Sequence, residues 1–216
     1  MYRFETKCIQ SGYQPENGQP RTLPIYQSTT YKYDDAAALG KLFDLEAEGH
    51  MYTRISNPTV AAVEAKIADL EGGVGAMLTS SGQAASFMAI FNICSRGQNF
   101  ISMNHIYGGT INLFSVTLAR MGIEVRYASD DMTDEELEAL FDENTRLVFG
   151  ETVANPALTV LDIRRYADLA HKHGVPMVVD NTFTTPILCR PFEHGADIVT
   201  HSTTKYMDGH TEVPRD

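Results

Sequence analysis

The chain has 216 residues, of which 43% are hydrophobic and 21% charged, a composition typical of a globular protein with a hydrophobic core. The formal net charge is −11 and neither Lys nor Arg clusters anywhere, which argues against a nucleic-acid or anionic-membrane partner. The first residues lack the apolar core of a signal peptide and no apolar run could span a bilayer, so we expect a cytoplasmic protein.

Residues 1–55 are predicted to form an irregular N-terminal arm. Pro15 and Pro20 interrupt its first part, and residues 23–31 form an extended, aromatic-rich segment. A short helix is expected over residues 34–48. Because such an arm is poorly equipped to form its own core, we expect it to pack on another chain or on the body of this one.

Regular secondary structure is predicted over residues 56–216, which we interpret as one domain. Asn57-Pro58 is a helix N-cap followed by proline at the first helical position, and Gly72-Gly73 ends that helix. The other predicted helices begin at Ser81, Tyr107, Thr133, Asp162 and after Pro186, and the predicted strands are 76–79, 99–103, 123–127, 146–150, 175–180 and 198–200. Strands and helices alternate at βαβ spacing, which predicts an α/β fold with a mostly parallel sheet covered by helices on both faces.

Polar side chains follow the last two predicted strands. Asp180 comes after Val178-Val179, and three hydroxyl residues and Lys205 come after Ile198-Val199. Open α/β sheets bind ligands at the carboxyl ends of their strands. A lysine, hydroxyls and an acid are the groups that pyridoxal phosphate needs. Taken alone, the pattern is more typical of a solvated lysine and a turn-capping aspartate, both of which are common after strands.

Six short motifs also occur in order along the chain. They are Tyr52-Thr-Arg54-Ile-Ser-Asn57-Pro58-Thr59, Thr79-Ser-Ser81-Gly82-Gln83-Ala-Ala, Tyr107-Gly-Gly-Thr110, Asn155-Pro156, Val179-Asp180-Asn181-Thr182 and Ser202-Thr-Thr-Lys205-Tyr206. With these motifs the chain resembles the Cys/Met-metabolism family of pyridoxal-phosphate enzymes, over nearly everything from Phe4 to His210, and most of all its O-acetylhomoserine sulfhydrylase branch. The resemblance implies the large domain of a fold-type I transferase, with pyridoxal 5'-phosphate as the cofactor.

The resemblance implies a role for each candidate site residue. Lys205 is expected to hold the cofactor through a Schiff base and to move protons, Asp180 to face the pyridine nitrogen, and Tyr107 to stack on the ring. These three are the candidate catalytic residues, and no metal ligand is expected. The other cofactor-binding candidates are Ser81, Gly82, Gln83, Ser202 and Thr204 at the phosphate, Asn155 and Thr182 beside the cofactor or substrate, and Tyr52 and Arg54 at the phosphate of a neighbouring subunit.

Each candidate also has an ordinary structural role, which the sequence leaves open. Ser81 can be a plain helix N-cap, Tyr107 a core tyrosine and Arg54 a surface residue of the arm. An Asn-Pro turn and a turn threonine are the alternatives for Asn155 and Thr182. If Arg54 does reach a neighbouring subunit, the active site is shared between chains. We then expect a homotetramer, built as a dimer of active-site-sharing dimers.

The activity implied by the resemblance is γ-replacement on an amino-acid substrate. O-acetylhomoserine exchanges its acetate for sulfide or a thiol, giving homocysteine or a related thioether in methionine biosynthesis. The alternatives are a methionine γ-lyase or cystathionine γ-synthase of the same family, or an inactive cofactor-binding or oligomerisation fragment. A nicotinamide dehydrogenase is rejected, because no Gly-x-Gly-x-x-Gly motif follows the first strand.

We expect the chain to be truncated. Members of the family continue well beyond this length with the rest of the large domain and a smaller C-terminal domain, which contains the arginine for the substrate carboxylate. Residues 211–216 also depart from the small-residue pattern expected after Gly209-His210. The isolated chain is therefore predicted to have weak or no turnover.

The cysteines and histidines do not predict a metal site. Cys8, Cys94 and Cys189 are far apart without a Cys-x-x-Cys motif, which indicates reduced thiols. His171 and His173 lie two residues apart in a predicted helix and so point to different faces.

Overall fold

The computed structural model describes residues 2–209 and divides the chain into two units, Met1–Leu78 and Thr79–Asp216. These compact units are not the predicted domains, so the division into an arm (1–55) and a large domain (56–216) stays a prediction. The expectation about the tail, residues 211–216, lies outside the described residues.

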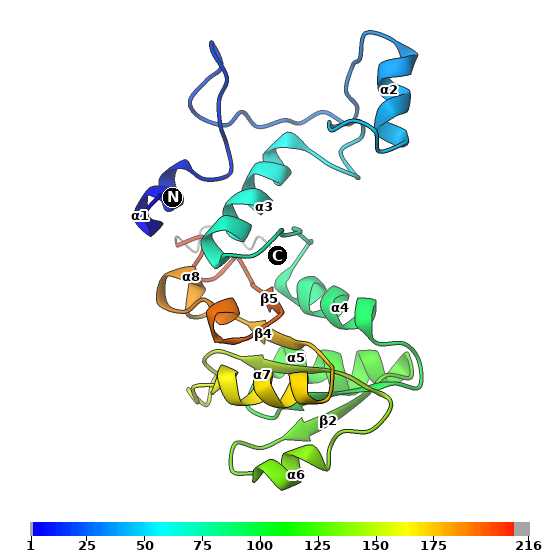
Figure 1. Cartoon of the computed structure of the whole chain (residues 1–216), viewed down its shortest axis with the longest axis vertical. Helices are drawn as coiled ribbons and strands as arrows, with labels where there is room; N and C mark the ends of the chain where they lie inside the picture. The colour runs from blue at the N-terminus through cyan, green and yellow to red at the C-terminus, as the bar shows by residue number, and fades with distance from the viewer. Residues whose placement is uncertain (1, 210–216) are drawn as a thin grey trace. The chain divides into compact units, whose positions relative to one another are not determined.

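The first unit contains three helices, drawn in blue and cyan in Figure 1. They are α1 (Phe4–Gln10), α2 (Ala36–Phe43) and α3 (Pro58–Glu71). The local signals for α3 act as predicted: the Asn57 side chain accepts the Thr59 N–H at 2.9 Å, and the helix ends at Gly72 with a φ of 80°. Helix α2 lies inside the predicted range 34–48 and is capped by the Asp35 side chain.

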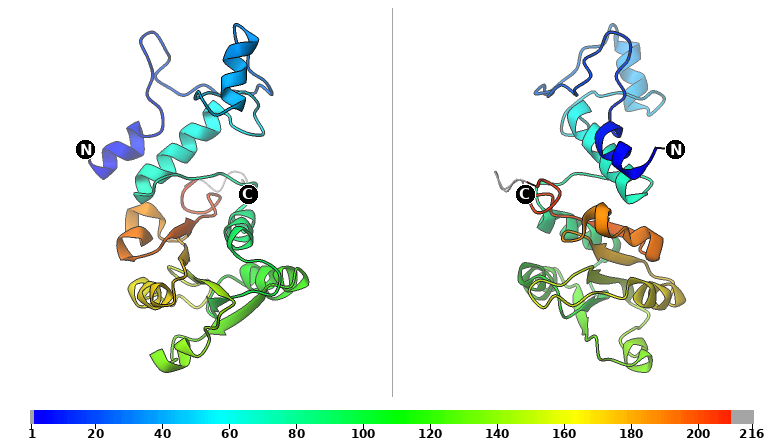
Figure 2. Two further views of the ribbon diagram at one scale, coloured as in Figure 1. Left: turned by 45° about the vertical axis from the view of Figure 1, so that its right-hand side comes forward. Right: turned by 90° about the vertical axis from the view of Figure 1, so that its left-hand side faces the viewer.

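The prediction of an irregular N-terminus is wrong for α1. This helix has no side-chain N-cap, so local sequence signals are weak. It packs beside α3, as Figure 2 shows, and the Lys7 Nζ donates to Asp69 Oδ1 of α3 at 2.6 Å. The Ser11 hydroxyl donates to the other oxygen of the same carboxylate. Tertiary contacts of this kind stabilise a seven-residue helix that would be marginal alone.

The second unit is an α/β body built on a five-stranded parallel sheet of order β2-β1-β3-β4-β5. Its strands are β1 (Asn99–Met103), β2 (Glu124–Ala128), β3 (Thr145–Glu151), β4 (Met177–Asp180) and β5 (Ile198–Thr200). Its helices are α4 (Gly82–Ile93), α5 (Gly108–Asn112), the π-helix η1 (Leu113–Leu118), α6 (Asp134–Glu138), α7 (Ile163–Lys172), α8 (Thr185–Leu188) and the 3₁₀ helix η2 (Pro191–His194). The predicted parallel α/β fold is confirmed. No helix in the described part of the chain is long and apolar enough to cross a lipid bilayer.

The predicted strand over residues 76–79 is wrong. These residues have no regular secondary structure and pair with no strand in the described part of the chain. A strand needs a neighbour to take its backbone hydrogen bonds, and the Leu78 N–H donates to Glu64 Oε1 at 2.8 Å instead.

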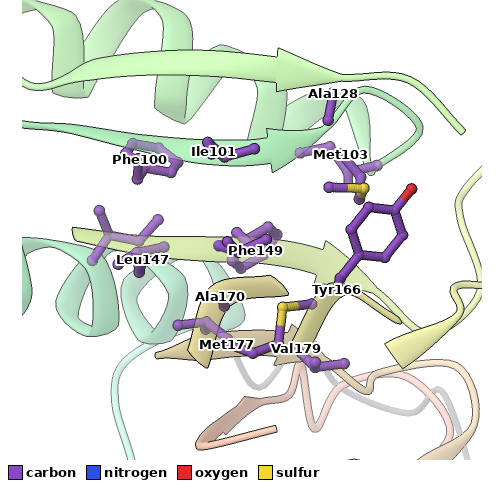
Figure 3. Close-up of a cluster of buried hydrophobic side chains, with 14 of the residues drawn as sticks. Phe100, Ile101, Met103, Ala128, Leu147, Phe149, Tyr166, Ala170, Met177 and Val179 are labelled. Atoms are coloured by element: carbon purple, nitrogen blue, oxygen red, sulfur yellow. The ribbon is translucent and has the colours of Figure 1, made fainter. Parts of the chain in front are cut away.

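Helices cover both faces of the sheet. Figures 1 and 2 show α7 on one face and α5 with η1 on the other. On the η1 side the Phe114 ring makes edge-on contacts with Phe100 and Phe149, with ring centroids 4.9 and 5.0 Å apart. On the other face α7 buries the stripe predicted from its spacing, which includes Tyr166 and Ala170, as Figure 3 shows.

The strand order places a crevice between β1 and β3, at the carboxyl ends of these strands. From β1 the chain crosses to β2 on one side, whereas β3 is followed by β4 and β5 on the other. The connections that leave β1 and β3 therefore diverge at the carboxyl ends of these adjacent strands. Such a switch point is where open α/β sheets bind their ligands.

Candidate active site

A pocket of about 290 Å³ lies at the carboxyl end of the sheet in the second unit. The residues around it come from the start of α4, from the connection after β1, and from the ends of β3, β4 and β5. The lining consists of Ser81, Gly82, Gln83, Tyr107, Glu151, Val153, Asn155, Asp180, Thr182, Phe183, Ser202 and Lys205.

Nine of the twelve candidate residues meet in this pocket, including Lys205 and Asp180. Thr204 is close in sequence to two lining residues but does not itself line the pocket. Tyr52 and Arg54 belong to the first unit, where the Arg54 guanidinium carbon lies 5.4 Å from the Tyr52 ring centroid.

Three lining residues were missed from the sequence: Glu151, Val153 and Phe183. Glu151 follows a predicted buried strand just as Asp180 does, and that position could have identified it. Val153 and Phe183 are apolar neighbours of candidate residues and carry no signal of their own.

The start of α4 presents free backbone donors to the pocket. The Ser81 hydroxyl caps the helix by accepting the Ala84 N–H at 2.9 Å, so the plain N-cap reading of this serine holds for its side chain. The N–H groups of Gly82 and Gln83 bond to no other described residue. A Cβ on Gly82 would lie 2.7 Å from Ser202 Cβ, so only glycine lets the loop after β5 approach the helix start.

Tyr107 stands at the start of α5 with its ring against the following turn. A Cβ on Gly109 would lie 2.4 Å from the Tyr107 ring, so the Tyr-Gly-Gly sequence allows the ring to fold back closely. The tyrosine is half-exposed, with 48% of its surface accessible, and it is therefore not a core residue. Its ring is available to a ligand in the pocket.

Asp180 ends β4 with its carboxylate held in one orientation. Its Oδ1 accepts both the Thr182 N–H at 3.0 Å and the Thr182 hydroxyl at 2.5 Å, and the Ser202 N–H in turn donates to that hydroxyl at 2.9 Å. Burial raises the pKa of Asp180, while the two bonds from Thr182 act in the opposite direction. Oδ2 accepts no hydrogen bond from the described residues and is free for a ligand.

Lys205 reaches the pocket from the loop after β5. Its backbone N–H donates to the Ser202 carbonyl oxygen at 3.2 Å, which places the lysine on a turn. No hydrogen bond or ion pair engages its amine within the part of the chain that the structure describes. A lysine without an ion-pair partner is suited to act as a nucleophile toward an aldehyde.

Together these features define a class of protein. A parallel sheet whose strand ends gather a lysine, a carboxylate and an open helix N-terminus is the arrangement of the large domain of fold-type I pyridoxal-phosphate enzymes. The family then follows from comparison with known proteins. The chain belongs to the Cys/Met metabolism family of PLP-dependent enzymes, whose sequence profile matches residues 5–214.

Individual relatives and solved structures agree with this assignment. The chain is 43% identical over 210 residues to the homocysteine/cysteine synthase of Kluyveromyces lactis, covering 96% of this chain and 47% of that protein. It is 45% identical to O-acetyl-L-homoserine sulfhydrylase 1 of Thermus thermophilus, covering 98% and 51%. The fold matches a Campylobacter jejuni protein described as an O-acetylhomoserine (thiol)-lyase, with a TM-score of 0.91, 37% identity and coverage of 97% and 51%. That crystal structure carries a pyridoxyl-lysine phosphate at position 205 of its own chain.

The chain spans about half the length of the curated relatives that it matches.

The residues present fit the cofactor of this family. The two free N–H groups at the start of α4 and the close approach of Ser202 suit a phosphate. Asp180 offers its Oδ2 to a pyridine nitrogen, and the Lys205 amine is unengaged by the described residues. Donors for the phosphate, an acid for the ring and an amine for the aldehyde are thus gathered in one pocket.

Proposed function

We propose that the whole protein catalyses pyridoxal-phosphate-dependent γ-replacement. O-acetylhomoserine and sulfide, or a thiol, are converted to homocysteine, or a thioether, and acetate. The observation that carries this proposal is the pocket in which Lys205, Asp180 and the start of α4 meet. Relatives named homocysteine synthase and O-acetylhomoserine sulfhydrylase support the choice of reaction within the family.

Bound pyridoxal phosphate supplies an electron sink for negative charge that develops on the substrate carbon atoms. The N–H groups of Gly82 and Gln83, with the Ser202 hydroxyl, bind its phosphate. The Asp180 carboxylate binds the pyridine nitrogen and keeps it protonated, and Thr182 holds that carboxylate in place. The Tyr107 ring would stack on the ring of the bound cofactor, and Asn155 lines the same pocket.

Lys205 has two tasks in this proposal. Its Nζ would hold the cofactor through the aldehyde, and the same nitrogen would accept the proton that leaves the substrate α-carbon. A base that is already placed beside the substrate acts at a high effective concentration. The lining side chains also limit access of water to the reacting carbon atoms.

Product analysis tests the reaction class. With O-acetylhomoserine and sulfide, the purified whole protein is expected to form homocysteine and acetate in equal amounts. Methionine or cysteine alone should yield no 2-oxo acid. Release of a thiol and a 2-oxo acid from methionine alone identifies a γ-lyase instead. Cystathionine formed with cysteine as the preferred nucleophile identifies a cystathionine γ-synthase.

We further propose that Tyr52 and Arg54 complete the phosphate site of a second copy of the chain. Arg has the planar geometry that phosphate binding favours, and the Arg54 guanidinium lies near the Tyr52 ring. The site is then shared, and the protein is a homo-oligomer whose smallest active form is a dimer.

Subunit complementation tests the shared site. Arg54→Ala and Lys205→Ala proteins, each inactive alone, are unfolded together in equal amounts and refolded. Half of the random dimers are then mixed, and one of their two sites is intact, so activity should recover to about a quarter of the wild-type value. Mixing without unfolding is the control. No recovery in dimers shown to be mixed would place both residues in a site formed by one chain.

A cytoplasmic location is part of the proposal. The structure describes all three cysteines and joins none of them in a disulfide, which suits a reducing compartment.

A further inference from the structure

Glu151 is a buried carboxylate in the pocket that has no part in the roles assigned above. It is the last residue of β3, only 8% of its surface is exposed, and it lines the pocket with Asp180 and Lys205. Burial raises its pKa to about 7, and the nearby charge of Asp180 acts in the same direction. A buried acid is costly to keep, so its contacts indicate what it does there.

The two carboxylate oxygens of Glu151 bind two different loops. Oε1 accepts the Tyr107 N–H at 2.7 Å, from the connection after β1. Oε2 accepts the Asn155 N–H at 3.3 Å, from the connection after β3. Because β1 and β3 are neighbours whose connections diverge, one side chain thus ties together the two walls of the crevice.

The bond to Tyr107 also satisfies a backbone N–H that has no other acceptor among residues 2–209. Tyr107 is the N-cap residue of α5 and makes no side-chain cap. A carboxylate that accepts a backbone N–H beside a helix start forms a charge-assisted bond, stronger than a neutral one. This bond fixes the point at which the Tyr107 side chain leaves the backbone, and the turn at Gly109 then confines the ring.

We propose that Glu151 is a positioning residue that holds Tyr107 against the cofactor site. The carboxylate acts on the cofactor through the Tyr107 backbone and makes no direct contact with it. This inference rests on the proposed function for the identity of the ligand. The two bonds by which Glu151 joins the loops of Tyr107 and Asn155, which we call the clamp, do not depend on that function.

The clamp is tested first, without cofactor. In Glu151→Gln the side-chain volume is kept, but the amide NH₂ cannot accept an N–H, so one of the two loops loses its partner. At about pH 8, where the wild-type carboxylate is ionised, amide hydrogen exchange should become at least about tenfold faster in one of the two loops, residues 105–110 or 153–157. Exchange in β1 and β4 should be unchanged. Glu143→Gln, in the exposed turn that precedes β3, is the control and should have no effect.

The link to the cofactor is tested next in the reconstituted protein. Glu151→Gln should weaken pyridoxal-phosphate binding about tenfold, measured by absorbance titration, and should reduce the circular dichroism of the bound cofactor. If Glu151 acts through Tyr107, its effect should largely disappear in a Tyr107→Ala background, where a further change below about twofold is expected.

Each outcome decides the matter. Unchanged exchange in both loops, residues 105–110 and 153–157, overturns the clamp. Faster exchange with unchanged cofactor affinity, or a general loss of thermal stability, makes the role structural only. Equal effects of Glu151→Gln with and without the Tyr107 ring mean that Glu151 contacts the cofactor directly, which also overturns the proposal. A wild-type protein that shows the clamp but binds no pyridoxal phosphate refutes the proposed function rather than the clamp.

Discussion

Replacing Lys205 by alanine is expected to lower kcat/KM for γ-replacement by about 10⁴-fold or more, because one amine provides both the cofactor attachment and the proton transfer. Its position on the turn after β5, in the same pocket as Asp180, leaves no other lysine among the lining residues to replace it. A second readout is independent of turnover. Borohydride reduction followed by peptide mass spectrometry should find the pyridoxyl group on Lys205 in the wild type and no labelled peptide in the variant.

The matched control is Lys172→Ala. Lys172 is an exposed lysine of α7 that pairs with Glu138, and a surface ion pair of this kind contributes little to stability. Its kcat/KM should equal that of the wild type. A label found on another lysine, or a Lys205→Ala protein with near-normal turnover, would remove Lys205 from the centre of the mechanism.

Asp180→Asn is expected to lower kcat/KM by about 10²-fold or more and to weaken cofactor binding. The substitution keeps the shape but removes the negative charge that holds a proton on the pyridine nitrogen, and a charge-assisted bond of this kind contributes about 3 kcal/mol. Thr182 can still donate to the asparagine oxygen, so the loop after β4 should keep its structure. Steady-state kinetics and cofactor titration measure the two effects.

A cofactor analogue separates charge from structure at this position. In the Asn variant, pyridoxal phosphate methylated at the ring nitrogen carries a permanent positive charge and should restore part of the lost turnover. Asp168→Asn, an exposed residue of α7, is the control and should behave as the wild type. If the analogue gives no recovery although it binds, Asp180 acts by holding the loop rather than by its charge.

Much of the fold could be predicted because its elements carry their own start and stop signals. Helix α3 begins after the Asn57 cap and ends at Gly72, α6 has its Thr133–Glu136 capping box, and the buried face of α7 follows the helical period. Such signals depend on bonds between residues three or four apart. The elements that were wrong, α1 and the strand at 76–79, depend on partners distant in the sequence.

The candidate site, like the fold, could be predicted from the sequence only in part. Asp180 and Lys205 could be recognised because reactive side chains directly follow β-branched strands, and the motifs supplied their neighbours. Glu151 also ends a largely buried strand, but it stands in none of the six motifs and was overlooked. The hydrogen bond from the Thr182 hydroxyl to Asp180 was also overlooked, since a threonine two residues after an acid is typical of a turn.

Residue order alone was sufficient for the alternation of strands and helices, the parallel sheet and the identity of the lysine and the acid that follow its last strands. Those features depend on periodicity and on neighbours along the chain. Only the folded chain decided that the loops after β1 and β3 are joined by one buried carboxylate, and that Gly82 must lack a side chain beside Ser202. Contacts between segments tens of residues apart depend on how strands are ordered in the sheet, and no local pattern encodes that order.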